Sequence, residues 1–151
     1  MPSGSLARMR VLGLDLGSKR IGVALSDPEG AIASPLTTLE RQGGAGDLTA
    51  VGELVREHDV GEIVVGLPLH MDGRRGPEAE AAKRFASELR GALGIRVGTI
   101  DERWTTVEAE RALRESGRRG KKQRAVVDSV AAAILLRTWL EQRRGRAKAS
   151  T

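Results

Sequence analysis

Three acidic positions in this chain have side chains of the type that holds hard divalent cations. Asp15 lies in the apolar segment Arg10–Leu16, Asp101 and Glu102 end a second apolar segment, and Asp128 lies in a third. A carboxylate in apolar surroundings costs several kcal/mol unless a cation or a set of donors meets it. Carboxylates gathered at one place repel one another unless divalent ions lie between them, and Mg²⁺ or Mn²⁺ suits all-oxygen ligands. Two such ions, about 4 Å apart, can activate water and hold the leaving oxygen of a phosphodiester.

Asp15 and Asp128 also have purely structural explanations. Asp15 could cap the turn at the end of its strand, because aspartate is common in turns. Asp128 could interact with the positive end of its helix. It nevertheless aligns with Ala131, Ala132 and Leu135 at helical spacing, so its carboxylate is expected on the packing face. We favour cation binding for both residues.

The charge pattern indicates a polyanionic partner. The chain has 25 Lys and Arg against 20 Asp and Glu, a net charge of +5. The basic residues are densest in 111–124 and again in 143–148. Clustered basic side chains attract nucleic acid, although ordinary solvated surface explains the second cluster equally well. Phe85, Trp104 and Trp139 are the only aromatic residues, which argues against a base-stacking platform and favours phosphate contacts.

Length and composition predict one domain in a reducing compartment. We expect a flexible extension over residues 1–8, a single domain over 9–144 and a flexible basic tail over 145–151. The absence of cysteine excludes disulfides, thiolate zinc sites and cysteine nucleophiles. The first ten residues lack the apolar core of a signal peptide, and no segment approaches the length of a membrane span. We therefore expect a cytoplasmic protein with no membrane partner.

Hydrophobic periodicity predicts an α/β domain with the element order βββ-α-β-α-β-α-α. Strands are expected at about 10–16, 20–26, 31–39, 62–66 and 95–101, the first three forming an antiparallel meander. Helices are expected at about 47–58, 77–93, 105–116 and 125–144, with a basic loop over 117–124. That loop lacks the spacing of a phosphate-binding P-loop, and we interpret it as a mobile basic flap over substrate.

Four motifs, in order, resemble one family. They are Gly13-Leu-Asp-Leu-Gly-Ser-Lys-Arg-Ile-Gly-Val-Ala24, Gly66-Leu-Pro-Leu-His-Met-Asp-Gly73, Asp101-Glu-Arg-Trp-Thr-Thr106 and Val127-Asp-Ser-Val-Ala-Ala132. The set resembles the YqgF/RuvX family of Holliday junction resolvase-like, pre-16S rRNA nucleases, and it covers about residues 9–140. His70 stands where the family commonly has asparagine, and Trp104 where it commonly has an aliphatic residue.

The resemblance implies an RNase H-like fold, a mixed five-stranded sheet in βββαβαβα order with helices on both faces. It also implies that Asp15, Glu102 and Asp128 are the catalytic, metal-binding carboxylates, with Mg²⁺ or Mn²⁺ as cofactor. Asp101 is the reserve for Glu102, because strand register decides which of the two side chains faces the site.

A set of basic side chains is predicted to contact nucleic acid near these carboxylates. Alternatives remain for some members. Lys19 and Arg20 could be edge-strand charges that discourage aggregation, and Arg103 could neutralise Asp101 or Glu102. The loop that carries Arg74 and Arg75 could be only a connection. The full set is Lys19, Arg20, Arg74, Arg75, Arg103, Arg118, Arg119, Lys121, Lys122 and Arg124.

The expected function is a divalent-metal-dependent nuclease, and the resemblance favours 5′-end maturation of pre-16S ribosomal RNA. One alternative is resolution of four-way DNA junctions, which calls for two active sites in a symmetric dimer. Another is a non-catalytic ribosome-assembly or nucleic-acid-binding factor. An actin-like ATPase would need two lobes, which 151 residues cannot hold. The sequence leaves monomer and dimer both open.

Overall fold

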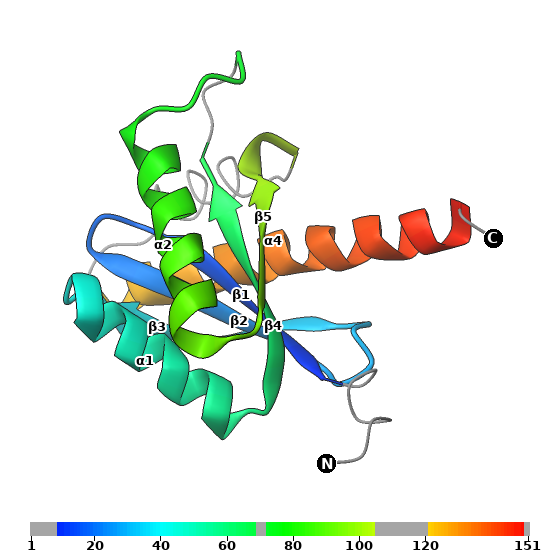
Figure 1. Ribbon diagram of the computed structural model, residues 1–151, viewed down its shortest axis with the longest axis horizontal. Helices are drawn as coiled ribbons and strands as arrows, with labels where there is room; N and C mark the ends of the chain where they lie inside the picture. The colour runs from blue at the N-terminus through cyan, green and yellow to red at the C-terminus, as the bar shows by residue number, and fades with distance from the viewer. Residues whose placement is uncertain (1–8, 69–71, 105–120, 150–151) are drawn as a thin grey trace.

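A five-stranded mixed sheet forms the centre of the molecule. The computed structural model describes residues 9–68, 72–104 and 121–149. The strands are β1 (Arg10–Leu16), β2 (Arg20–Ser26), β3 (Ala33–Glu40), β4 (Val60–Leu67) and β5 (Arg96–Asp101), in the order β3-β2-β1-β4-β5 (Figure 1). β1–β2 and β2–β3 pair antiparallel, whereas β1–β4 and β4–β5 pair parallel. The predicted meander and mixed sheet are confirmed.

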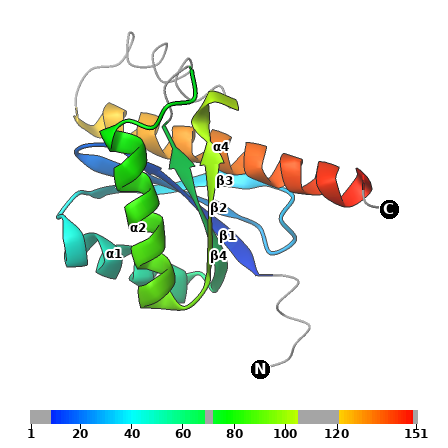
Figure 2. The same ribbon diagram turned by 45° about the horizontal axis from the view of Figure 1, so that its top comes forward.

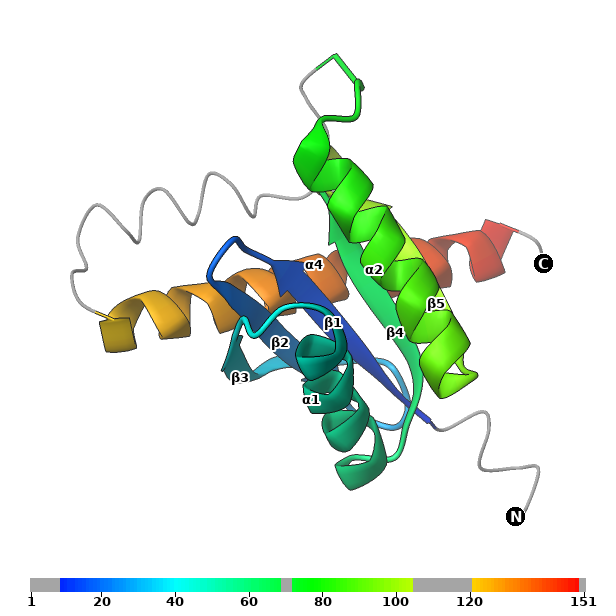
Figure 3. The same cartoon turned by 60° about the vertical axis from the view of Figure 1, so that its left-hand side comes forward.

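Helices cover both faces of this sheet, as predicted. α1 (Gly44–Glu57) and α2 (Pro77–Leu93) lie on one face, and α4 (Lys121–Ala149) crosses the other (Figures 1 and 3). A short 3₁₀ helix, η2 (Glu102–Trp104), follows β5. None of the helices in the described ranges is long and apolar enough to cross a membrane.

The structure corrects the predicted limits of the last helix. α4 begins at Lys121, so residues 121–124 form its first turn and not the end of a basic loop. It continues to Ala149, past the predicted end at Arg144 and into the stretch expected to be a tail. The helix predicted over 105–116 and the rest of the loop, 117–120, lie outside the described residues.

Large aliphatic side chains fill the space between the sheet and α1 and α2. Alternate residues of β1 point to this side, and Leu12 and Leu14 are fully buried there with Val51 of α1 and Leu89 of α2. The sequence limits α2 clearly: Pro77 occupies its first turn, and Gly94 ends it in the left-handed conformation, at φ 67°. Large aliphatic side chains therefore make up this half of the hydrophobic core.

The α4 side of the sheet combines aliphatic side chains such as Val64 and Leu135 with glycines and alanines. A β-carbon at Gly13 of β1 would lie 2.9 Å from the β-carbon of Leu136, and one at Gly98 of β5 would lie 2.9 Å from the Trp139 ring. Ala131 and Ala132 of α4 are buried in the same layer. Glycine and alanine therefore let the α4 backbone approach the strands closely.

One edge of the sheet gathers the ends of several elements. β1, β4 and β5 are parallel and all finish there, and the antiparallel β2 begins there at Arg20. The η2 turn after β5 projects from this same edge (Figure 2). Side chains from four separate elements can therefore meet at this edge.

Candidate active site

Asp15 lies next to last in β1, on the α4 face of the sheet. It shares that face with Val11 and Gly13, as the sequence predicted, and only 4% of the residue is exposed. In the β1–β2 register, Asp15 stands opposite Gly22. The position beside this buried carboxylate is therefore open to whatever approaches from α4.

Asp128 fills the position above Gly22. A β-carbon at Gly22 would collide with the main-chain carbonyl of Asp128 and would lie 3.2 Å from its Cβ. The missing side chain at Gly22 is thus what lets this turn of α4 settle on β2 next to Asp15. The predicted placement of Asp128 on the packing face of its helix agrees with this contact.

Glu102 reaches the same face from η2. It is 5% exposed, and a β-carbon at Gly66 of β4 would lie 3.2 Å from both its Cγ and its Cδ. Gly66 directly follows Val65, which pairs with Leu14, so Glu102 sits over the strand adjacent to Asp15. Asp15, Glu102 and Asp128 therefore surround one small area of the sheet, where Gly22 and Gly66 have no side chains to fill the space.

Asp101 is held by its neighbour instead. Arg103 donates from Nη2 to Asp101 Oδ2 at 2.6 Å, and its Nε and main-chain N–H also bond this carboxylate. The hydrogen bond from the Arg103 side chain holds the pKa of Asp101 below its ordinary value, against the opposing effect of burial. Arg103 thus pairs with Asp101, one of the two structural pairings considered for it.

Sequence reasoning missed a pair of residues that support the Asp15 turn. Arg41 donates from Nη1 to the carbonyl of Gly17 at 2.8 Å, and its main-chain N–H bonds the carbonyl of Lys19 at 2.9 Å. Its Nε in turn donates to Asp47 Oδ2 at 2.9 Å. No motif marks Arg41, because it is distant in sequence from the turn that it braces.

Asp47 holds Arg41 in place from within α1. Its carboxylate is 2% exposed and accepts hydrogen bonds from Arg41 and from the main-chain N–H groups of Gln42 and Gly43. Burial on its own raises the pKa of Asp47, but these hydrogen bonds outweigh it and leave the pKa below the ordinary value. Asp47 is therefore an ionised group inside the fold.

The donor chemistry of the three carboxylates suits Mg²⁺ or Mn²⁺. Within residues 9–68, 72–104 and 121–149, no three His, Cys, Asp or Glu side chains are placed to hold one ion. Mg²⁺ commonly uses only one or two carboxylates and completes its shell with water and substrate phosphate. The all-oxygen set, two of whose members are buried, fits that manner of binding and does not form a closed protein cage.

The predicted basic residues have different surroundings. Arg20 donates to Asp128, and Lys19 is exposed beside it. Arg74 pairs with Asp72 at 2.6 Å, and Arg75 lies 3.8 Å from Glu80, both at exposed positions after β4. Lys121, Lys122 and Arg124 belong to the first turn of α4. The other two members, Arg118 and Arg119, lie outside the described residues. The same is true of His70 and Thr105 in the family-like motifs.

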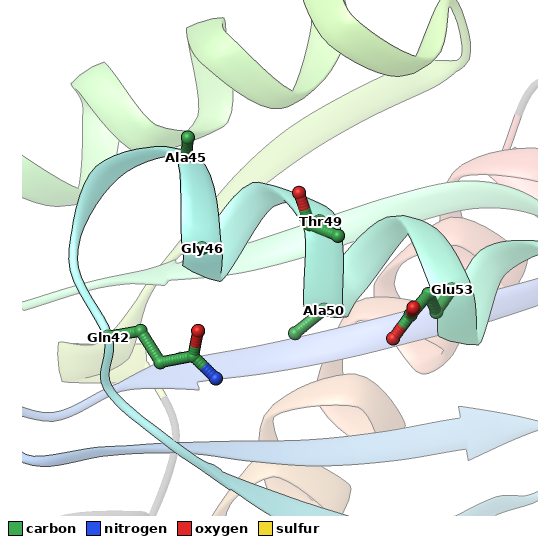
Figure 4. Close-up of a pocket in the computed structure, with 6 residues that line it drawn as sticks. All are labelled: Gln42, Ala45, Gly46, Thr49, Ala50 and Glu53. Carbon is green, nitrogen blue, oxygen red and sulfur yellow. The ribbon is translucent and has the colours of Figure 1, made fainter.

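Two hollows in the surface lie away from these carboxylates. One of about 320 Å³ runs along α1, lined by Gln42, Thr49 and Glu53 among others, on the sheet face opposite α4 (Figure 4). The other, of about 710 Å³, lies between the beginnings of β1, β4 and β5, where Met9, Val60 and Arg96 line it. Neither contains Asp15, Glu102 or Asp128, the three residues called the acidic constellation below.

Solved structures with the same architecture place the molecule in a class. Thermus thermophilus RuvC in complex with a Holliday junction substrate superposes with a TM-score of 0.54, at 17% identity, over 91% of this chain and 96% of that one. A fowlpox virus resolvase superposes with a TM-score of 0.51, at 10% identity, over 89% and 98%. The fold is therefore the RNase H-like fold of these resolvases.

The sequence comparison is more specific. The family model described as "RuvX: Holliday junction resolvase" matches residues 9–142. A protein of Moorella thermoacetica named "Putative pre-16S rRNA nuclease" is 49% identical over 134 residues, 89% of this chain and 96% of its own length. One of the same name from Anaeromyxobacter dehalogenans is 47% identical over 135 residues, 89% and 98%. The chain belongs to the RuvX family.

Proposed function

We propose that this protein is a divalent-metal-dependent nuclease that hydrolyses phosphodiester bonds during 5′-end maturation of pre-16S ribosomal RNA. The observation that carries the proposal is the convergence of Asp15, Glu102 and Asp128 on one small glycine-floored area at the sheet edge. Three elements distant in sequence bring carboxylates there, and two of those carboxylates belong to buried residues. A fold has no need of such charges for packing.

The proposed roles follow from the surroundings of each acid. Asp15 and Glu102 are buried on the α4 face, and Asp128 borders them, so these three would hold Mg²⁺ or Mn²⁺. We choose Glu102 over Asp101 because Arg103 already occupies the Asp101 carboxylate. When bound, such ions activate water and stabilise the charge that develops on the phosphate.

The protein's own residues orient these groups. Gly22 and Gly66 give Asp128 and Glu102 access to the sheet surface, and Arg41 braces the turn that follows Asp15. Lys19, Arg74 and Arg75 border the same edge, and Arg118, Arg119, Lys121, Lys122 and Arg124 precede Asp128 in sequence. We propose that these basic residues, with Arg103, contact substrate phosphates, which position a nucleic acid without reading its sequence.

The choice of ribosomal precursor RNA rests on the names of the relatives, which share nearly half of this sequence over nearly their whole length. Such a nuclease would work where ribosomal RNA is made, in the cytoplasm. The resolvase function remains the second candidate, because the superposed RuvC and fowlpox structures hold Holliday junctions. A non-catalytic assembly factor would leave the acidic constellation without a purpose.

The test is cleavage of two labelled substrates, a 5′-extended 16S precursor RNA and a four-way DNA junction, each with Mg²⁺, Mn²⁺ or EDTA. Asp15→Asn is the test variant. Asp27→Asn is the matched control, because Asp27 caps the β2–β3 turn through its Oδ1 and is not part of the site. We expect metal-dependent cutting of the RNA that Asp15→Asn loses and Asp27→Asn keeps. Preferred cutting of the junction would transfer the assignment to a resolvase. Binding without cutting by every form would indicate an assembly factor.

A further inference from the structure

One of the proposed metal ligands already has a cation beside it. Nε of Arg20 donates to Oδ2 of Asp128 at 2.7 Å, joining the first residue of β2 to the start of α4. The two side chains are 15% and 16% exposed, so water screens this pair only in part. Arg20 and Gly22 lie two residues apart and share one face of β2, which places the guanidinium on the α4 side, next to Asp128.

The position of Arg20 bears directly on metal binding. A carboxylate oxygen that accepts a hydrogen bond from a guanidinium in this geometry cannot also bind a divalent ion at the same lone pair. Arginine stays protonated at any physiological pH, so it can be displaced but not neutralised. The structure shows no three described carboxylates arranged around a single ion, and Asp128 is turned toward Arg20.

From this contact we infer that Arg20 is a resident cation of the site, which a divalent ion displaces from Asp128 when the centre is loaded. The inference rests on the proposed function, because it takes Asp128 to be a metal ligand. Arg20 compensates the carboxylate while the ion is absent, and it lowers the affinity for the ion by competing for the same oxygen. Once displaced, the guanidinium remains tethered at the start of β2, within the site edge where a substrate phosphate must lie.

This role differs from that of an ordinary stabilising ion pair. Removing a merely structural pair between α4 and β2 would loosen the site, and metal would bind more weakly or equally well. Removing a competitor makes metal bind more tightly. The direction of the change in metal affinity therefore separates the two explanations.

The chain offers a matched control at the other end of α4. Nη2 of Arg143 lies 2.6 Å from Oε2 of Glu62, so this pair also joins α4 to the sheet and is partly buried. Arg143 also lies over the Trp139 ring, 5.2 Å from its centroid, at a distance from the acidic constellation. Arg143→Gln removes the same unit of charge as Arg20→Gln, so it reports the effect of net charge alone.

The experiment is Mn²⁺ titration of the full-length protein, followed by electron paramagnetic resonance of the free ion at constant ionic strength. Arg20→Gln is expected to bind Mn²⁺ about tenfold more tightly than wild type, whereas Arg143→Gln stays within about twofold. Thermal unfolding gives a second readout: Mn²⁺ should raise the melting temperature of Arg20→Gln more than that of wild type. Equal or weaker binding by folded Arg20→Gln would overturn the inference.

Asp15→Asn distinguishes this inference from the proposed function beneath it. If wild type does not bind Mn²⁺, or if Asp15→Asn binds it equally well, the proposed metal centre is wrong and both proposals fall. If wild type binds Mn²⁺ more tightly than Asp15→Asn but Arg20→Gln gains nothing, only the role of Arg20 is wrong.

A measurement on the unaltered protein covers the case in which Arg20→Gln does not fold. The side-chain Nε–Hε nuclear magnetic resonance signal of Arg20 should shift on titration with Mg²⁺, because the ion displaces this group from Oδ2 of Asp128. The corresponding signal of Arg143 should not shift. An Arg20 signal that does not move at saturating Mg²⁺ would contradict the exchange.

Discussion

The two faces of the sheet are packed differently, because only the α4 face combines its aliphatic residues with glycines and a buried carboxylate. Toward α1 and α2, the strands present full-sized aliphatic side chains such as Leu12 and Leu14, and Leu89 of α2 packs among them. Toward α4, the same strands also carry aliphatic side chains such as Val64, but glycines and a buried aspartate lie among them, and alanines of the helix meet them. Neighbouring residues of one strand, Leu14 and Asp15, therefore belong to two different environments.

The difference shows how a small domain can hold buried charge. Large side chains on the first face stabilise the fold at roughly 25 cal/mol per Å² of apolar surface removed from water. The second face gives up part of that volume at Gly22 and Gly66, which brings Asp128 and Glu102 onto the sheet next to Asp15. Substitutions on the first face should therefore change stability, and substitutions on the second should change chemistry.

Exchange of Glu102 for glutamine should have the largest effect on that chemistry. We expect Glu102→Gln to lower the cleavage rate on the order of 10³-fold, because a lost metal ligand costs several kcal/mol in the transition state. Asp101→Asn is the matched control, since its carboxylate is bound to Arg103 and should affect cleavage by less than about tenfold. Single-turnover cleavage of the preferred substrate measures both. Equal losses in the two variants would mean that the structure does not separate their roles.

Truncation of a large side chain on the opposite face should change stability alone. Leu89→Ala removes a fully buried side chain of α2 and should lower the free energy of unfolding by about 3 kcal/mol. Urea denaturation measures this loss, and cleavage per folded molecule should stay within about twofold of wild type. A much larger loss of cleavage by the folded variant would show that the two faces are coupled.

Addition of a single methyl group should destabilise the protein on the α4 face and stabilise it on α2. Gly22→Ala places a β-carbon against the Asp128 carbonyl, and we expect a loss of about 2 kcal/mol in stability together with reduced cleavage. Gly91→Ala on α2 is the control, because nothing lies within 4 Å of a β-carbon there. Alanine is the better helix former, so this variant should gain up to about 1 kcal/mol. A harmless Gly22→Ala would refute the close approach of α4.

The contacts between Asp47 and Arg41 should give an effect on stability that depends on pH. Asp47→Asn loses one acceptor oxygen and the charge facing Arg41, which should cost about 2 kcal/mol at pH 7. Because the pKa of Asp47 is lowered in the folded protein, its contribution is complete above the ordinary value near 3.9. The difference between wild type and Asp47→Asn should therefore shrink as the pH falls below about 4. Denaturation curves from pH 7 to pH 3 test this, and a constant difference would contradict it.

Much of the fold could be predicted because local signals were strong. Alternation in β1 predicted which residues share a face with Asp15, and Pro77 and Gly94 marked both ends of α2. The start of α4 was misjudged because glycines and clustered basic residues at 117–124 are typical of a loop, whereas the helix begins at Lys121. Local sequence patterns cannot show how far a helix held by tertiary contacts extends.

The sequence could propose the carboxylates, but it could not predict the residues that support them. Acidic residues beside apolar segments are visible in one dimension. The Arg20–Asp128 bond joins residues 108 positions apart, and Arg41 reaches back 24 positions to the carbonyl of Gly17. The glycines at 22 and 66 gain their meaning only from the helix and the η2 turn above them. These contacts depend on tertiary packing, which no local pattern encodes.

The most direct test of the division between the faces is the gain in stability that Mg²⁺ confers. Free energies of unfolding would be measured in EDTA and in excess Mg²⁺ for wild type, Asp15→Asn and Leu89→Ala. A ligand that binds only the folded state at a hundred times its dissociation constant adds about 2.7 kcal/mol. We predict that Leu89→Ala starts lower but keeps the full gain of the wild type, whereas Asp15→Asn shows none. An equal gain in Asp15→Asn, or its loss in Leu89→Ala, would contradict the assignment of chemistry to the α4 face.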